Sequence, residues 1–250
     1  MRFCVCIKQV PDIAAPMQVQ GGTLLLDPNR VVLNAYDASA VEAALVLTEQ
    51  HGGEVDVVLV GPERATETIR KALAMGAERG THLVVPDGTE LDSAAVAKLL
   101  AEHLRDQSYD AILTGKQAQD TDAGLAGAML ATHLGLPYAT NAVGLAQEGD
   151  TLVVTRQGDA GQEVIVLPTP CLVTCSNDMN DPRIPNLKGI MAAKKKTIEA
   201  RPVGSVPAPV VRTLGYEAVP ERAAGRRLEG EPEELAREVA RLLHAEARVL

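Results

Sequence analysis

The sequence has 250 residues, of which 46% are hydrophobic, and its formal net charge at neutral pH is −9. A chain of this size and composition can bury a real core, so we expect one large α/β domain, or one domain with appendages. The negative charge argues against general binding of nucleic acid or anionic lipid, because phosphate binding requires a basic surface. No apolar run approaches the roughly 20 residues that span a bilayer, so we expect no membrane insertion and a cytoplasmic protein.

Short β-rich runs alternate with longer, alanine-rich helical runs between residues 2 and 175. This alternation is typical of a doubly wound fold, in which a parallel sheet carries helices on both faces. The expected strands lie at 3–10, 55–61, 81–85, 110–115 and 171–176. The expected helices lie at 38–51 behind an Asp37 cap, and at 63–75, 92–107 and 122–134.

The remainder of the chain departs from this alternation. Residues 141–168 alternate polar and apolar side chains around glycine-containing turns, which predicts an antiparallel β addition. The proline-rich segment 201–216 predicts a linker, and 231–249 predicts an amphipathic helix whose apolar stripe needs a surface to cover it. We therefore expect an α/β domain over 1–200 and a C-terminal arm over 201–250.

The segment 181–199 places Leu187 in a proline-broken loop ahead of the lysines at 194–196. Pro182 and Pro185 cannot donate ladder hydrogen bonds and push the preceding residues toward extended conformations, so this segment should leave the body of the protein as a loop. These residues alone favour an ordinary surface loop whose leucine folds back onto the core. The alternative is a docking loop that offers the leucine to another protein.

Few residues of the chain can carry chemistry. Cys4, Cys6, Cys171 and Cys175 stand at strand spacings with no histidine at a ligand spacing, so we expect buried, reduced thiols and no metal site. The sequence also lacks the phosphate-loop, nucleophile-elbow and zinc-protease motifs. We therefore expect no catalytic residues and no enzymatic activity of the chain by itself.

One polar stretch, 114–130, joins an expected strand end to a helix start and contains Gly124 and Gly127. Ligands of open α/β sheets bind beyond the carboxyl ends of the strands, and the free N–H groups of a helix start suit a phosphate. The stretch is therefore placed to bind an adenine nucleotide. The alternative, to which the residues give equal weight, is a purely structural stretch in which Asp122 only caps the helix and the glycines only allow close packing. The residues that would complete a cleft at the same rim are 34–37, Cys6 and Val60.

Several longer motifs act together. They are VCIKQVPD at 5–12, LNAYDASAVEAAL at 33–45, GPERATETIRKALAMGAERGTHL at 61–83, LTGKQAQDTDAGLAG at 113–127, the hairpin ending in LPTPCLVT, and DPRIPNLKGIMAAKKKTIE at 181–199. With them the chain resembles, over nearly its whole length, the small (beta) subunit of electron-transfer flavoproteins. Those heterodimers pass electrons from flavin dehydrogenases to a membrane quinone oxidoreductase.

The resemblance implies that 1–200 is a doubly wound domain of the adenine-nucleotide-binding type with a buried, structural AMP. Residues 123–126 offer backbone N–H groups where many relatives have polar side chains. The redox FAD of the family lies mainly in the alpha subunit, and Ile13 stands where relatives often place a tyrosine near it. Some bifurcating relatives hold a second FAD instead of AMP. The chain has no longer glycine-rich stretch that would make room for a dinucleotide, so we expect AMP. The implied AMP contacts are Cys6, Asn34, Ala35, Tyr36, Asp37, Val60, Gly115, Lys116, Gln117, Ala118, Gln119, Asp120, Thr121, Asp122, Ala123, Gly124, Leu125 and Ala126.

The resemblance also makes 181–199 the recognition loop of the family, with Leu187 as its anchoring leucine. It implies an electron carrier subunit that embraces the alpha subunit through the arm 201–250 and docks acyl-CoA dehydrogenases in fatty acid oxidation. An ATP-using enzyme or a nucleotide-sensing protein of the same fold would need a glycine- or serine-rich phosphate loop, which the sequence lacks. The implied docking residues are Leu187, Ile190, Met191, Lys194, Lys195 and Lys196.

Overall fold

The computed structural model of the chain describes residues 1–220 and 224–249, so residues 221–223 and 250 of the expected arm lie outside the described part. The described residues fall into two units, 1–215 and 216–250.

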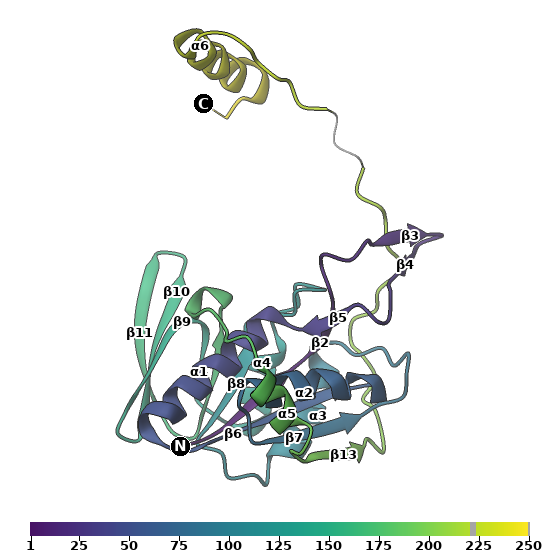
Figure 1. Cartoon of the computed structure of the whole chain (residues 1–250), viewed down its shortest axis with the longest axis vertical. Coiled ribbons are helices and arrows are strands. Elements are labelled where there is room, and N and C mark those ends of the chain that lie inside the picture. The colour runs from purple at the N-terminus through teal and green to yellow at the C-terminus, as the bar shows by residue number, and fades with distance from the viewer. Residues whose placement is uncertain (221–223, 250) are drawn as a thin grey trace. The chain divides into compact units, whose positions relative to one another are not determined.

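The first unit is built on a nine-stranded sheet with the strand order β11-β10-β9-β12-β8-β1-β6-β7-β13 (Figure 1). The strands from β9 to β13 in this order run parallel to their neighbours, and β10 and β11 continue the sheet as an antiparallel addition, as predicted. The bounds are β1 (Arg2–Ile7), β6 (Glu54–Gly61), β7 (Arg79–Val84), β8 (Ala111–Gly115), β9 (Tyr138–Glu148), β10 (Thr151–Gly158), β11 (Gly161–Pro168), β12 (Cys171–Cys175) and β13 (Ile198–Pro202).

Helices cover both faces of the sheet. The bounds are α1 (Ala35–His51), α2 (Thr66–Met75) behind the short turn η1 (Glu63–Ala65), α3 (Ser93–Leu104), α4 (Ala126–Leu134), and α5 (Leu187–Ala193) after the turn η2 (Asn177–Met179). Alternate residues of each strand enter different cores, because successive side chains of a strand point to opposite faces. In β1, Phe3 and Val5 join the core under α1 and α2, whereas Cys4 and Cys6 join the core under α3 and α4. The doubly wound arrangement is therefore confirmed, and all four cysteines are buried and free.

This topology fixes where a ligand site can form. The chain moves outward from β1 to β6 and β7 through α1 and α2, and then returns to the other side of β1 to form β8 and β12. The order of the strands therefore reverses between β1 and β8. In open α/β sheets such a reversal leaves a crevice at the carboxyl ends of the two strands, because the connecting helices diverge to opposite faces.

The structure departs from the expected elements near residues 8–33. β1 ends at Ile7, and the chain instead forms β2 (Gln9–Pro11), which pairs with β5 (Val31–Leu33) in a separate small sheet. Between them lies an unexpected hairpin of β3 (Gln18–Gln20) and β4 (Thr23–Leu25). Gly21 and Gly22 form its turn with φ of 58° and 77°, a conformation that favours glycine. The prediction of one strand over 3–10 is therefore wrong beyond Ile7.

The second unit contains α6 (Pro232–Leu242) and a short π-helical turn, η3 (Leu243–Ala247). None of the residues of α6 is buried, and Val239 remains 43% exposed on its apolar face. The predicted amphipathic helix is thus confirmed, and its apolar stripe is not covered within this unit. Among the described residues of either unit, no helix has the length and apolar character required to cross a membrane.

Candidate functional site

The loop between β8 and α4 lies at the strand reversal beside β1. Its first residue after the strand, Lys116, donates its backbone N–H to the Cys175 carbonyl at 2.8 Å, so the loop starts against the end of β12. The helix begins at Ala126, later than the predicted start at Asp122. Asp122 has a φ of 53°, which no helical residue adopts, and this left-handed residue keeps the loop open until Leu125. The N-cap role for Asp122 is therefore wrong.

Asn34, directly before α1, binds this loop with both the nitrogen and the oxygen of its side-chain amide. Its Nδ2 donates to the Gln117 carbonyl at 2.9 Å, and its Oδ1 accepts from the Gln119 backbone N–H at 3.1 Å. The Gln119 side chain returns the contact, since its Oε1 accepts from the Ala35 N–H at 3.1 Å. Asn34 is 1% exposed, so removing these bonds would leave buried polar groups unpaired.

Asp37 lies in the first turn of α1, which begins at Ala35 after Asn34, so its predicted role as the cap of this helix is wrong. It joins the loop to the end of β1. Its carboxylate accepts from the Lys8 N–H at 2.7 Å and from the Gly115 N–H at 2.9 Å. The Lys8 amide follows β1 and the Gly115 amide belongs to the last residue of β8, so Asp37 binds both strand ends at the reversal. Binding of the Lys8 amide explains why β1 stops at Ile7 and does not extend through residue 10. Burial raises the pKa of Asp37 to about 7, against the opposing effect of these hydrogen bonds. Asp37 in turn contributes to the raised pKa of Cys175, which burial sets at about 12.

Contacts within the loop give it a fixed shape. The Ala118 N–H donates to the Ala123 carbonyl at 3.0 Å, and the Asp122 N–H donates to the Ala118 carbonyl at 2.8 Å. The Lys8 ammonium pairs with Asp120 at 2.8 Å, which links the loop across to the segment after β1. The Lys116 ammonium lies 5.5 Å from the centre of the Tyr36 ring, a cation–π distance.

Two glycines allow the close approach on which this arrangement depends. A β-carbon at Gly115 would collide with the Asp37 carboxylate and lie 2.7 Å from the Tyr36 β-carbon. A β-carbon at Gly127 would lie 2.6 Å from Thr174 and 2.7 Å from Thr114, so α4 could not pack on the sheet. The close-packing interpretation of the glycines is therefore confirmed at Gly127. The ligand-binding interpretation of the loop stays a prediction.

The structure thus brings 34–37 and 115–120 into direct contact. Cys6 and Val60 lie in neighbouring strands at the same edge, on the face that α3 and α4 cover. The chain enters α4 from the loop after β8, so the helix begins near this edge. Its first N–H groups have no carbonyl partner within the helix, as at any helix start, and carry the partial positive charge of the helix dipole. A donor set of backbone amides at a strand reversal fits the phosphate of an adenine nucleotide.

Residues 180–196, which we call the docking segment after its predicted role, differ from the loop at the strand reversal because they expose large apolar side chains. Ile184, Leu187 and Met191 are 91%, 75% and 53% exposed, so Leu187 does not fold back onto the core. The loop predicted over 181–199 is confirmed only as far as Asn186. α5 begins at Leu187 itself, capped by Asn186, whose side chain accepts from the Gly189 N–H at 2.8 Å, and β13 begins at Ile198, so the loop prediction is wrong over these two elements. Sequence reasoning missed Ile184, although its place before Pro185 was a signal of a fixed, extended backbone.

Lys196 differs from the other two lysines of the run. Its ammonium donates to the carbonyls of Ala77, Gly76 and Leu73, at 2.6, 3.3 and 3.5 Å, which are the last carbonyls of α2 and of the turn after it. Ile13 is 67% exposed in the turn after β2. No hydrogen bond joins Ile13 to the loop 116–125 in the part of the chain that the structure describes.

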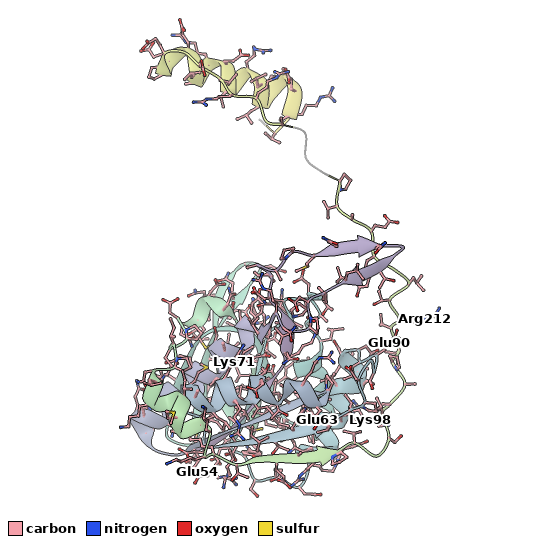
Figure 2. All side chains as sticks on the ribbon, turned by 45° about the vertical axis from the view of Figure 1, so that its right-hand side comes forward. Glu54, Glu63, Lys71, Glu90, Lys98 and Arg212 are labelled. Carbon is pink, nitrogen blue, oxygen red and sulfur yellow. The ribbon has the colours of Figure 1, made fainter. Side chains whose placement is uncertain are left out.

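A separate shallow cleft of about 350 Å³ lies between α3 and the segment after β13, with Lys98, His103 and Arg201 on its wall; Lys98 is labelled in Figure 2. None of the predicted nucleotide residues lines this cleft. Within 1–220 and 224–249, no group of three or more histidine, cysteine or acidic side chains is placed to hold a metal ion.

Comparison with known proteins decides the family. Residues 23–206 match the model of the electron transfer flavoprotein domain. The chain is also 39% identical to the electron transfer flavoprotein subunit beta of Bradyrhizobium diazoefficiens and 33% identical to that of Bacillus subtilis, in both cases over the whole of each chain. The chain belongs to the electron transfer flavoprotein beta-subunit family. The subunit beta of Sus scrofa is 36% identical over 97% of this chain and 99% of its own length.

Proposed function

We propose that this beta subunit binds one AMP at the strand reversal, in a structural role. The observation that carries the proposal is the loop 115–126, which Asn34 and Asp37 fix at the carboxyl edge of the sheet with the α4 amides at its end. Because Asn34 and Asp37 use their side chains to hold the loop, they act on the nucleotide mainly by positioning backbone groups. Residues 123–126 supply N–H groups to the phosphate, and Lys8 and Lys116 add positive charge at the two sides of the loop.

AMP fits this loop better than a second FAD. A β-carbon at Gly124 would already lie 3.1 Å from the Lys116 carbonyl, and the hydrogen bonds within 118–123 close the loop on itself. The Lys8–Asp120 ion pair and the Asn34 contacts add to this closure, which supports the smaller ligand. Cys6 and Val60 form the floor beside the nucleotide from the neighbouring strands.

The redox FAD is held mainly by an alpha subunit in this proposal, and the beta subunit closes one side of it near Ile13. The flavin supplies the redox chemistry when it is bound. The residues of this chain exclude water from that side and hold the two subunits in register. The arm 201–250 wraps the alpha subunit, since the apolar face of α6 needs a cover and its own unit provides none.

Electrons arrive from flavin dehydrogenases of the acyl-CoA type and leave to a membrane quinone oxidoreductase, as in fatty acid oxidation. Docking uses the exposed apolar side chains of the docking segment, with Leu187 as the anchor and Ile190 and Met191 beside it. Lys194 and Lys195 steer the approach of an acidic partner surface. Lys196, whose ammonium is occupied by α2 carbonyls, contributes by holding the segment in place.

The nucleotide is tested by denaturing the purified heterodimer and chromatographing the released nucleotides. We expect one AMP and one FAD per heterodimer, and we expect Gly115→Ala to lose the AMP but keep the FAD. Gly204→Ala is the matched control, because a β-carbon there meets no atom within 4 Å. Two FAD and no AMP in the unmodified heterodimer would overturn the assignment.

A further inference from the structure

The docking segment is fastened to the helices beneath it by buried and half-buried charges. Arg183 is the centre of one attachment. Its backbone N–H and its Nε donate to Glu42 Oε2 at 3.0 and 2.8 Å, and one terminal nitrogen donates to Glu42 Oε1 at 2.9 Å. The same guanidinium reaches Glu49 at 2.5 and 3.1 Å.

These contacts fix residue 183 in an unusual way, because the backbone and the side chain bind the same carboxylate. Glu42 is 7% exposed, and Glu42 and Glu49 lie two turns apart on one side of α1. The two glutamates raise the pKa of Arg183 further above its ordinary value, so the guanidinium stays charged. A bidentate arginine pair with a buried carboxylate has little freedom to rearrange.

The chain next to Arg183 is stiff for a second reason. Pro182 and Pro185 flank the pair 183–184, and a proline restricts both its own φ and the conformation of the residue before it. Ile184, which is 91% exposed, therefore follows a fixed residue and precedes a proline. Asn180 adds an attachment upstream, where its Nδ2 donates to the Ser39 carbonyl of α1 at 3.0 Å.

The other end of the segment is fixed on α2 by reciprocal hydrogen bonds, in which a basic side chain from each side binds backbone carbonyls of the other. Arg70 of α2 donates to the carbonyls of Ala193 and Lys196 at 2.6 and 2.7 Å, at the end of α5. Lys196 in return donates to the carbonyls that end α2. Between these bonds the two helices touch, since a β-carbon at Gly189 would lie 2.5 Å from the Ala74 carbonyl.

We propose that Arg183, with Glu42 and Glu49, is the positioning residue of the docking surface, which sets the place of Ile184 and Leu187 before a partner arrives. The inference rests on the proposed docking function. An apolar side chain held in its bound position loses little freedom on association, so affinity depends on the clamp as well as on the anchor. Arg183 does not touch the partner, because its donors face α1. Because the Glu42 half of the clamp is buried, the effect of Arg183 on docking depends less on salt than that of Lys194 and Lys195.

The test measures reduction of the intact heterodimer by an acyl-CoA dehydrogenase and its acyl-CoA substrate. For Arg183→Gln we expect KM for the heterodimer to rise about fivefold or more, which corresponds to about 1 kcal/mol, with kcat unchanged at low and high salt. Arg183→Lys restores part of the loss, since a lysine keeps the charge but not the fork. Arg64→Gln removes an arginine that pairs with Asp87 away from the docking segment, and serves as the control.

Loss of the Arg183 guanidinium leaves the buried Glu42 carboxylate with only the backbone N–H of residue 183 as a donor from this segment, so two further variants protect the test against misfolding. Glu49→Gln removes only the exposed half of the clamp and should raise KM in the same direction by a smaller factor. Arg183→Gln combined with Glu42→Gln removes the charges of both partners and should still raise KM. A normal KM in Arg183→Gln and in the double variant, with a raised KM in Leu187→Ala, overturns the positioning role.

A second measurement separates this inference from the docking function itself. Hydrogen exchange of the amides 184–193 in the free heterodimer should be faster in Arg183→Gln than in the unmodified protein and in Arg64→Gln. If Leu187→Ala leaves KM unchanged, the docking function fails, and faster exchange still shows that Arg183 orders the segment. Unchanged exchange in Arg183→Gln contradicts the clamp whatever the kinetics show.

Discussion

Replacing Leu187 with alanine should weaken docking without weakening the fold. The side chain is 75% exposed in the free chain, so its truncation removes little buried area, and a surface change of this kind alters stability by about 0.5 kcal/mol at most. In the proposed docking, the same side chain becomes buried on association. Burying a leucine contributes roughly 1.5 to 3 kcal/mol, which corresponds to a roughly tenfold to hundredfold change in affinity.

The assay combines transfer kinetics with thermal unfolding on the same protein. Leu187→Ala should raise KM in electron transfer from an acyl-CoA dehydrogenase by about tenfold or more, while the flavin spectrum, AMP content and melting temperature stay nearly unchanged. Val164→Ala is the control, because Val164 is 68% exposed on β11 and lies outside the docking segment. Leu73→Ala marks the opposite behaviour, since Leu73 is 1% exposed and its truncation should cost roughly 2 to 5 kcal/mol of stability.

A large loss of stability in Leu187→Ala with normal transfer would mean that the leucine supports the core, against its exposure. An equal rise of KM in Val164→Ala would mean that general surface hydrophobicity, and not a localised anchor, controls docking.

Two further predictions concern the site and the arm. Burial raises the pKa of Asp37 from 3.8 to about 7, so the folded chain holds this proton more firmly than the unfolded chain does, and the stability that it contributes is complete below about pH 4 and is lost as the pH rises through 7. The melting temperature should therefore fall more steeply between pH 5 and 8 in the unmodified heterodimer than in Asp37→Asn, and parallel curves would contradict the assignment. Truncation after Gly215 should leave the first unit folded, with its core intact, but release the alpha subunit or its FAD; a truncated chain that retains both as tightly would show that the arm is not needed for assembly.

Hydrophobic periodicity predicted the parts of the fold that depend on local sequence. The parallel strands, the helices on both faces and the antiparallel addition follow from alternation and from turn residues. The helix expected over 92–107 forms over Ser93–Leu104, and Asp92 caps it, accepting from the Ala95 N–H at 2.8 Å. The early end of β1 was not predictable in this way. It depends on a carboxylate that lies 29 positions away from Lys8 in the chain and binds its amide.

The candidate site was located by sequence, but the roles of its side chains were not. The loop 115–126 and residues 34–37 meet as the motifs imply, yet Asn34 uses its amide to bind backbone groups 83 and 85 positions away, which no local pattern reveals. The triple lysine run reads as one basic patch in the sequence. Only the position of α2 separates Lys196, which caps that helix, from its two neighbours.

Both proposed functions depend on α1, which gives a final prediction. Asn34 and Asp37 hold the nucleotide loop at the start of the helix, and Glu42 and Glu49 hold the docking segment farther along it. Coupling between two sites requires an element with two arrangements, and α1 is a buried helix packed on the sheet. The two sites should therefore be independent.

Asn34→Ala should accordingly lower the AMP content of the heterodimer without raising KM for docking, and Arg183→Gln should raise KM without loss of AMP. Their combination should show both effects at their single-variant sizes, since distant sites that share no partner are additive. Loss of AMP in Arg183→Gln, or a raised KM in Asn34→Ala, would show that α1 moves as a rigid helix between two positions and couples the two sites. In that case nucleotide binding would control the docking surface, and AMP would be a regulator as well as a structural ligand.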